Sequence, residues 1–223
     1  GKSAYELTPS LLNLMNQCMQ IMLSEHDVAS TFQDVFEMVG PHFSVSRAFA
    51  FVREEDDLYS NLYEWCSGAI LPQKHLLQKI SIQEATPSLL EAFRQHGMII
   101  ASDVCALPQD MQNALKGQDV AAIALLPMWD EEELAGFVGF DHVSYHAWSP
   151  EEIVMLGNLA MLIANTVKRE RLKTEVVEKK HILDTVLQNT GFNAYVTELE
   201  TGELLWIHEP LKAHCPADPA FSG

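Results

Sequence analysis

Hydrophobic residues near the start of the chain recur at the spacing of an α-helix. Thr8-Pro9 marks a helix start, because threonine can cap a helix and proline fits its first position. Asp27 resembles a second cap, and Gly40-Pro41 is a stop signal. The pattern predicts two amphipathic helices with these apolar stripes: Leu11, Leu12, Met15, Met19 and Met22, then Val28, Phe32, Val35, Phe36 and Val39.

The middle of the chain changes to the patterns of β-strands. Apolar runs and aromatic residues at a period of two predict five strands, at 48–52, 58–66, 98–101, 120–126 and 134–140. Acidic turns join the first two strands and the last two. Short helices are predicted from Thr86-Pro87 to Gly97 and from Pro108 to Gly117. This order of elements predicts an α+β fold with an antiparallel sheet.

A long helix is predicted from Pro150 to about Gln188. Ser149 is its cap, proline takes the first position, and Glu152 completes a capping box. Its apolar positions form two stripes separated by a five-residue step: Leu156, Leu159, Ile163 and Val167, then Leu172, Val176, Leu183 and Val186. An unbroken helix of this extent is roughly 58 Å long, which is too long to pack only on its own domain. The step places the two stripes at different angles, so both cannot face one partner without local rewinding.

Strands are also predicted in the tail, at 194–199 and 204–207. Residues 191–223 are too few to bury a core without disulfides or a metal, since a segment below roughly 40 residues seldom folds alone. We therefore expect this tail to be the first part of a second domain.

Composition narrows the class of protein. The chain has 223 residues, of which 48% are hydrophobic and 20% charged, and a formal net charge of −17. That charge repels a phosphate backbone, which disfavours nucleic-acid binding. No apolar run reaches the roughly 18 residues of a membrane span and no signal peptide is recognisable, so a cytoplasmic protein is expected. The four cysteines show neither paired nor zinc-type spacing, which indicates no disulfide framework and no structural metal.

Four ordered segments together resemble a bacterial GAF domain. They are Asn61-Leu62-Tyr63-Glu64-Trp65-Cys66, Ala101-Ser102-Asp103-Val104, Ala135-Gly136-Phe137-Val138-Gly139-Phe140-Asp141 and Trp148-Ser149-Pro150-Glu151-Glu152-Ile153. The tail from His181, with its Thr201–Trp206 hairpin, is similar to the start of a PAS domain. The resemblance implies four parts: an amphipathic helix at 1–26, a GAF domain at 27–170, a signalling helix at 171–190 and a PAS-like segment at 191–223.

The resemblance also implies an antiparallel sheet with helices on one side and a small-molecule pocket on the other. Carried onto this sequence, the candidate pocket residues are Trp65, Cys66, Ile80, Phe93, Asp103 and Cys105. Trp65 can stack on a planar ligand or be an ordinary core residue, and Asp103 can bind a ligand or cap its own loop. The patterns of cyclic-nucleotide-binding and bilin-attaching members are missing, so the ligand is unknown.

The first functional hypothesis is a non-catalytic sensor. A small molecule in the pocket would change the packing of a helix shared by a homodimer, and the helix would act on a PAS domain and an output domain, either a diguanylate cyclase or a histidine kinase. The helix residues assigned to this role are Leu156, Leu159, Ile163, Val167, Leu172 and Val176. Two alternatives remain open at this point. One is a thiol-dependent reductase of a small oxidised metabolite that uses Cys66 and Cys105, and the other is a ligand-free dimerisation module.

Overall fold

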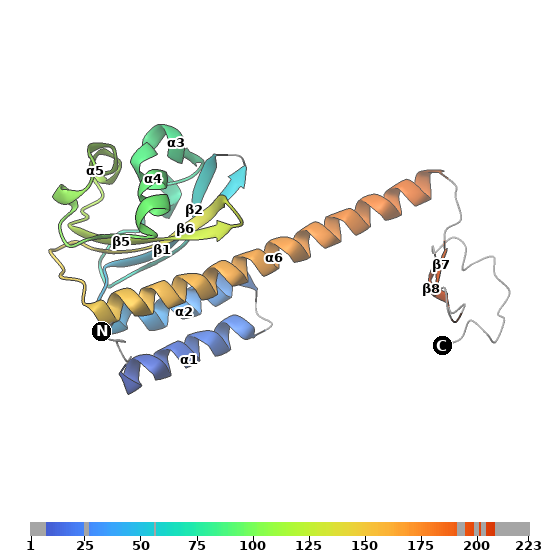
Figure 1. Ribbon diagram of the computed structural model, residues 1–223, viewed down its shortest axis with the longest axis horizontal. Helices are drawn as coiled ribbons and strands as arrows, with labels where there is room; N and C mark the ends of the chain where they lie inside the picture. Colours follow the sequence, from blue (N-terminus) through green and yellow to red (C-terminus); the bar gives the residue numbers. More distant parts are fainter. Residues whose placement is uncertain are drawn as a thin grey trace. The chain divides into compact units, whose positions relative to one another are not determined.

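The chain divides into two compact units, Gly1–Lys168 and Arg169–Gly223. The computed structural model describes residues 8–24, 27–55, 57–190, 195–198, 201 and 204–207. The first unit contains a six-stranded antiparallel sheet with helices on both faces (Figure 1). The α+β class with an antiparallel sheet, predicted from the sequence, is therefore confirmed.

The sheet has the strand order β3-β2-β1-β6-β5-β4. Its strands are β1 (Arg47–Glu55), β2 (Leu58–Cys66), β3 (Ile80–Ser81), β4 (Ile99–Ala101), β5 (Ala122–Asp130) and β6 (Glu133–His142). Each neighbouring pair is antiparallel. The pairs β1–β2 and β5–β6 end at Glu55–Leu58 and Asp130–Glu133, within the acidic segments that the sequence marks as turns.

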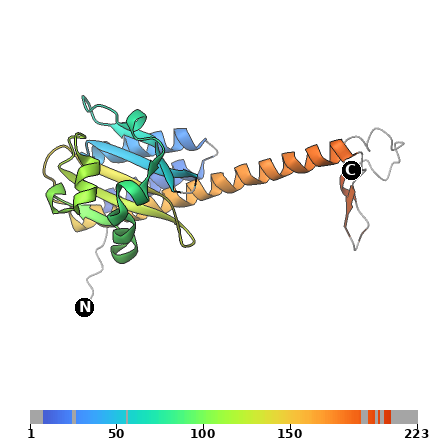
Figure 2. The ribbon, with the colours of Figure 1, turned by 90° about the horizontal axis from the view of Figure 1, so that it is seen from above.

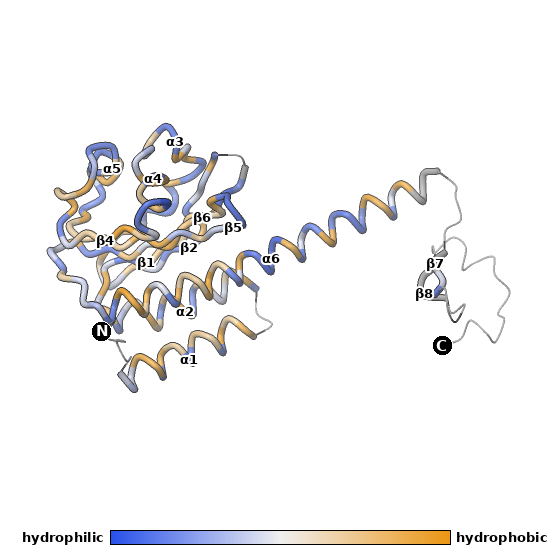
Figure 3. Tube along the Cα trace, in the orientation of Figure 1, coloured by the Kyte–Doolittle hydropathy of each residue, from blue (hydrophilic) through white to orange (hydrophobic). Residues whose placement is uncertain are grey.

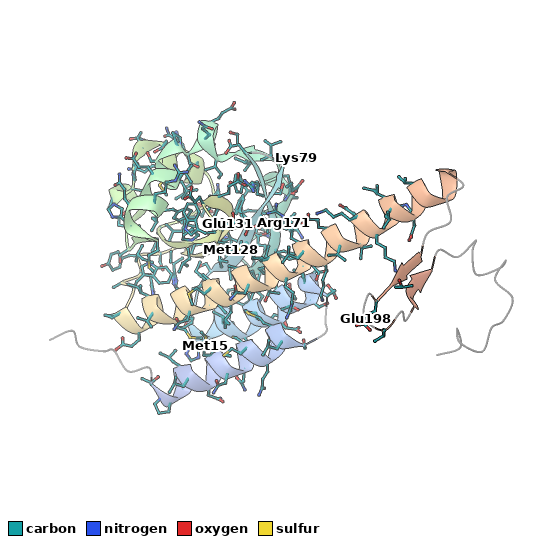
Figure 4. The ribbon with its side chains drawn as sticks, turned by 45° about the vertical axis from the view of Figure 1, so that its right-hand side comes forward. Met15, Lys79, Met128, Glu131, Arg171 and Glu198 are labelled. Atoms are coloured by element: carbon teal, nitrogen blue, oxygen red, sulfur yellow. The ribbon has the colours of Figure 1, made fainter. Side chains whose placement is uncertain are left out.

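Three helices lie on one side of the sheet, α1 (Pro9–Leu23), α2 (Val28–His42) and the first turns of α6 (Pro150–Thr190). Small side chains of β1, Ala48 and Ala50, face this helical layer and are fully buried. In Figure 1 the helix α1 lies on the far side of α2 and α6 from the sheet. Figure 4 marks Met128 on β5, which belongs to this core, and Met15 on α1, which packs against it.

The opposite face of the sheet is covered by short elements. These are η1 (Lys74–Leu76), α3 (Ile82–Ala85), α4 (Pro87–His96), η2 (Val104–Ala106) and α5 (Gln109–Leu115). Figure 2 shows the green segments that include α4 and α5 lying over the strands. A second apolar core fills this side, built from residues of β1, β2, β4, β5 and β6 and of the covering helices.

Local signals at the helix starts act as predicted. Thr8 Oγ1 accepts the N–H of Leu11 at 3.4 Å, and Asp27 Oδ1 accepts that of Ser30 at 3.0 Å. At the start of α6, Ser149 Oγ accepts the N–H of Glu152 while a Glu152 carboxylate oxygen accepts the N–H of Ser149. This reciprocal pair is the predicted capping box.

Three details of the sequence prediction were wrong. The buried face of α1 is formed by Leu11, Leu14, Cys18 and Met22, whereas Leu12 and Met19 are exposed, because α2 covers a face rotated from the predicted stripe. Helix α2 does not stop at Gly40-Pro41 but ends at His42, since the N–H of Phe43 still bonds to the carbonyl of Val39 at 3.1 Å. The short β3 and α3 were not predicted.

Helix α6 carries two apolar stripes with different surroundings. Leu156, Leu159 and Ile163 are buried in the helix-facing core, so they are not available to a partner chain as the sequence interpretation assumed. Val167 is half-buried at the edge of this core. The later stripe is exposed, at 51% for Leu172 and 66% for Val176. Figure 3 shows this change of hydropathy along the helix.

The second unit contains the rest of α6 and a hairpin of β7 (Tyr195–Thr197) and β8 (Leu204–Ile207). Both strands fall within the ranges predicted from the sequence. Most of the 191–223 segment, to which the PAS-like resemblance applies, lies outside the described residues.

Two helical glycines provide a matched test of this packing. A Cβ at Gly40 would lie 2.3 Å from the Trp65 ring, whereas a Cβ at Gly157 would meet only Met98 Cε, at 3.8 Å. We expect Gly40→Ala to lower the free energy of unfolding by about 1–3 kcal/mol through overpacking. Gly157→Ala should raise it by up to about 1 kcal/mol through helix propensity. Urea denaturation of both variants measures the two effects, and an unchanged Gly40→Ala midpoint would contradict the packing.

Candidate functional site

A cavity of about 110 Å³ lies between the sheet and the short helices α3, α4 and α5. Most of its wall is apolar. Strands β1, β5 and β6 contribute side chains from the face opposite the long helices, because successive strand residues point to opposite faces. These strand residues are Phe49, Phe51, Ile123, Leu125 and Phe137. The cavity is therefore a mostly apolar pocket of the kind that binds small molecules.

Aromatic rings fix one wall of the pocket. Phe51 and Phe137 stack in parallel with ring centroids 4.7 Å apart, and Phe49 meets Phe51 edge-on at 5.9 Å. Gly139 makes room for Phe49, since a Cβ at this position would lie 2.1 Å from the ring. The absence of a side chain at Gly139 thus sets the position of the Phe49 ring in the wall.

A group of polar residues forms the other end of the pocket. Arg47 Nε donates to Asp141 Oδ2 at 2.8 Å, and both side chains are almost fully buried. Arg47 Nη2 also donates to the carbonyl of Gln118 at 2.6 Å. Glu64 Oε2 accepts the N–H groups of Gln73 and Lys74 at 2.9 and 2.8 Å. Glu64 therefore holds the loop that follows β2 against the pocket.

Two residues of the lining each have a buried oxygen atom with no hydrogen-bond partner among the described residues. These atoms are Oδ1 of Asn61 and Oδ1 of Asp141. Buried polar atoms are nearly always hydrogen-bonded, so an unpaired acceptor calls for an explanation. Burial raises the pKa of Asp141 to about 6, although the Arg47 guanidinium acts in the opposite direction. Burying the charge of Asp141 is therefore costly, and Oδ1 of Asp141 and Oδ1 of Asn61 can each still accept a hydrogen bond.

The structure places the four residues other than cysteine that the sequence assigned to the pocket in different surroundings. Ile80 lines it. Phe93 is buried in the core beside it, with its ring centroid 6.0 Å from that of Phe137. Asp103 caps η2, because its Oδ1 accepts the N–H of Cys105 at 2.8 Å. Trp65 packs on the helical face of the sheet, against Gly40.

A β-bulge explains the position of Trp65. The register between β1 and β2 shifts between the pairs Ala50–Tyr63 and Phe51–Asn61. One extra residue in β2 reverses which face the later side chains occupy. Asn61 consequently lines the pocket, whereas Tyr63 and Trp65 turn to the helices.

Sequence reasoning did not select four polar residues of the lining, namely Arg47, Asn61, Glu64 and Asp141. The signal was nevertheless present for three of them, because Asn61 and Glu64 lie in the first segment of the GAF resemblance and Asp141 ends the third. Arg47 shares its strand face with Phe49 and Phe51, and a period of two is sufficient to place it there.

Neither candidate thiol is set up as a nucleophile. Burial raises the pKa of Cys66 to about 11, and the Glu64 carboxylate adds to this. A hydrogen bond to the Asp103 carboxylate raises the pKa of the exposed Cys105. Because the thiolate is the reactive form, these surroundings give no support to the thiol-dependent reductase.

A histidine pair joins the end of β6 to the start of α6. The rings of His142 and His146 stack with centroids 3.8 Å apart, and His146 Nε2 lies 3.0 Å from Glu152 Oε1. Trp148 closes the group and donates its indole N–H to the carbonyl of Ala101 at 3.2 Å. Burial lowers the pKa of His142 to about 4, so this ring is neutral at pH 7.

Neither a metal site nor a membrane span is evident in the described part of the chain. Its His, Cys, Asp and Glu side chains form no group of three or more that could hold a metal ion. Its helices include none that is both long enough and apolar enough to cross a membrane.

The sequence of this unit matches the model of a known protein family. The family model for the GAF domain matches residues 24–168, more than half of the chain. The chain therefore belongs to the GAF-domain family, as the resemblance in the sequence predicted.

The chain is also similar to a curated protein. The chain is 28% identical over 165 residues to the methanogenesis regulatory histidine kinase FilI of Methanothrix harundinacea (strain 6Ac). The match covers 71% of this chain but only 18% of that kinase. The chain thus corresponds to a small part of a much longer relative.

Solved structures share the fold at low sequence identity. The GAF domain of a phosphoenolpyruvate-protein phosphotransferase from Coxiella burnetii has a TM-score of 0.62 at 15% identity, covering 74% of this chain and 96% of that one. The phycocyanobilin-bound GAF domain of a cyanobacterial phytochrome has 0.64 at 12%, covering 75% and 98%. Free methionine-R-sulfoxide reductase from Neisseria meningitidis has 0.58 at 12%, covering 76% and 96%. These likenesses concern the fold alone.

The environment of Cys105 predicts slow alkylation. At pH 7.5 we expect iodoacetamide to modify Cys105 more slowly than it modifies free cysteine, because the Asp103 carboxylate disfavours the thiolate. Asp103→Asn keeps an oxygen that can cap η2 but removes the charge, and should accelerate the reaction roughly two- to fivefold. Asp34→Asn, an exposed change on α2, is the control for net charge. Peptide mass spectrometry measures the rates, and equal rates for all three proteins would refute this role of Asp103.

The buried His142 predicts a loss of stability in acid. The folded-state pKa of about 4 lies below the ordinary value of 6.5. In mild acid, His142 is therefore protonated in the unfolded chain but neutral in the folded chain. Between pH 7 and pH 5 this group should remove about 2 kcal/mol from the free energy of unfolding. His142→Phe keeps the ring stack without a titrating nitrogen and should lose that much less stability over the same range. If the free energy of unfolding falls equally in the two proteins between pH 7 and pH 5, the prediction is contradicted.

Proposed function

We propose that the chain is the sensory GAF module of a larger signalling protein, and that a small molecule occupies the pocket between the sheet and α3–α5. One observation carries the proposal: a mostly apolar cavity of about 110 Å³ is lined by two residues, Asn61 and Asp141, that each have a buried acceptor atom without a partner among the described residues. The regulatory histidine kinase among the relatives supports the same class of function.

The sheet offers a route from the pocket to α6. Arg47 and Asp141 face the pocket, whereas their neighbours Ala48 and Phe140 face the helical layer that contains the first turns of α6. Asp141 is also next to His142, which starts the histidine and tryptophan group before α6. A displacement of either strand end by a ligand therefore reaches the start of the helix through directly contacting residues.

The second stripe of α6 is suited to pairing with a second copy of the chain. Leu172, Val176, Leu183 and Val186 recur at intervals of four, seven and three residues, which is the heptad spacing of a two-stranded coiled coil. All four side chains are at least half-exposed. We infer a homodimer whose signalling helix covers 171–190.

The remaining parts of the proposal follow from the sequence resemblance. The helix leads to a PAS-like segment at 191–223, and the output domain of the parent protein is a histidine kinase or a diguanylate cyclase. Moving such an output from 1:99 to 99:1 takes about 5.5 kcal/mol of differential affinity. The ligand must therefore contact groups that differ between the two states, and the polar end of the pocket provides such contacts.

Native mass spectrometry of freshly purified protein tests the dimer and the ligand together. We expect a dimer that retains a small molecule. Val176→Glu with Leu183→Glu should convert it to monomer, because two carboxylates per chain would enter the apolar seam. Thr174→Glu with His181→Glu adds the same charges at exposed positions outside the seam and should leave the dimer intact.

The oligomeric state and the retained ligand can each contradict one part of the proposal independently of the other. A monomeric wild-type chain, or a dimer that survives the Val176 and Leu183 changes, would overturn the coiled-coil arrangement. A ligand-free mass, combined with no thermal stabilisation by any compound of a metabolite library, would overturn the sensory pocket. A true ligand at 100 times its dissociation constant should add about 2.7 kcal/mol to the stability.

A further inference from the structure

The lining of the pocket points to a chemical class of ligand. We propose that the pocket selects a compact, uncharged molecule, about the size of one aromatic ring, that is bound mainly through apolar contacts. This inference rests on the proposed function of the cavity as a ligand site, and it specifies which ligands the site accepts.

Apolar side chains enclose most of the cavity. The phenylalanine wall is continued by aliphatic and methionine side chains from β3 and the covering segments, which also belong to or pack against the second core. These are Leu77, Ile80, Ile82, Leu89, Met111 and Leu115. Moving apolar surface from water into such surroundings is favourable in proportion to the area buried. The main driving force for binding in this cavity is therefore the removal of an apolar body from water.

The charged groups of the lining are already compensated within the protein. These groups are Arg47, Glu64 and Asp141. Arg47 and Asp141 form an ion pair at 2.8 Å, and Arg47 also donates to a backbone carbonyl. The Glu64 carboxylate accepts two backbone N–H groups of the loop that follows β2. An ionised ligand would therefore share its counter-charge with a group that the protein already pairs.

The ionisation of Asp141 shows that this environment opposes a buried charge. Burial raises the pKa of Asp141 to about 6, although Arg47 Nε lies 2.8 Å from Asp141 Oδ2 and acts in the opposite direction. The cost of removing water thus outweighs the attraction of an adjacent opposite charge. A carboxylate or ammonium group on a ligand would meet the same cost, whereas an uncharged molecule would not.

The volume of the cavity limits the size of the ligand. The cavity measures about 110 Å³, and an apolar cavity of roughly 150 Å³ holds benzene. The wall is not easily widened, because Phe51 and Phe137 stack with ring centroids 4.7 Å apart and support each other. A molecule with one ring, or a branched aliphatic chain of similar volume, therefore fits the pocket, and a fused pair of rings does not.

Matched compounds test the inference on the 223-residue chain. Toluene and benzyl alcohol are uncharged one-ring molecules, benzylamine and benzoate carry opposite charges on the same ring, and naphthalenemethanol is the uncharged two-ring counterpart of benzyl alcohol. Titrations at neutral pH followed by NMR should show saturable shifts at the pocket residues for the two uncharged one-ring molecules. We expect these two to bind at least tenfold more tightly than the charged compounds and the two-ring alcohol.

A substitution that fills the cavity tests where these molecules bind. Leu125 lines the pocket from β5, and Leu125→Phe should occupy part of its volume and weaken toluene binding at least tenfold. The control, Leu12→Phe, makes the same change at an exposed position of α1 on the other side of the sheet, and should leave the affinity unchanged. If Leu125→Phe does not fold, the comparison of uncharged with charged compounds in the wild-type chain decides the question.

The outcomes distinguish this inference from the proposed function. Equal or tighter binding of benzylamine, benzoate or the two-ring alcohol at the pocket residues would overturn this inference but leave a ligand-binding pocket. Unchanged toluene affinity in a folded Leu125→Phe would also overturn it. No perturbation of the pocket residues by any of the five compounds would overturn it as well. The proposed function fails with it only if the purified protein retains no small molecule and no library compound stabilises it.

Discussion

Burial of both faces of the central sheet is the constraint on which the rest of this structure depends. Successive residues of a strand point to opposite faces, so each strand serves two layers at once. In β1, Ala48 and Ala50 allow the long helices to approach closely, while Phe49 and Phe51 build the wall of the pocket. A molecule in the pocket would therefore act on the same strands that support the first turns of α6.

The buried Arg47–Asp141 pair keeps the polar end of the pocket in place. It connects β1 to β6, and its bond to Gln118 adds the turn before β5. Taking two charges out of water is costly, and the raised pKa of Asp141 reflects that cost. Such a pair is a poor source of stability, yet removing one partner leaves an isolated buried charge. The pair holds Asp141, whose Oδ1 has no hydrogen-bond partner among the described residues, at a defined position in the lining of an apolar cavity.

The sequence alone was sufficient for most elements but not for the pocket. Apolar periods and cap residues are local signals. The caps Thr8, Asp27 and Ser149 therefore predicted where the long helices begin, and the apolar runs predicted the strands. The pocket depends on the bulge in β2, which no period reveals and which moves Trp65 to the helical face while Asn61 turns to the pocket. The buried face of α1 was likewise decided by how α2 packs on it, which puts Leu14 and Cys18 inside in place of Leu12 and Met19.

The edge strands of the sheet limit one route to aggregation. Its edge strands are very short, two residues in β3 and three in β4. Long exposed edges are templates onto which another chain can add a strand, and short ones offer few unpaired backbone groups. Strand addition from one molecule onto β3 or β4 of the next is consequently disfavoured, even at the high local concentration that association through a helix would produce.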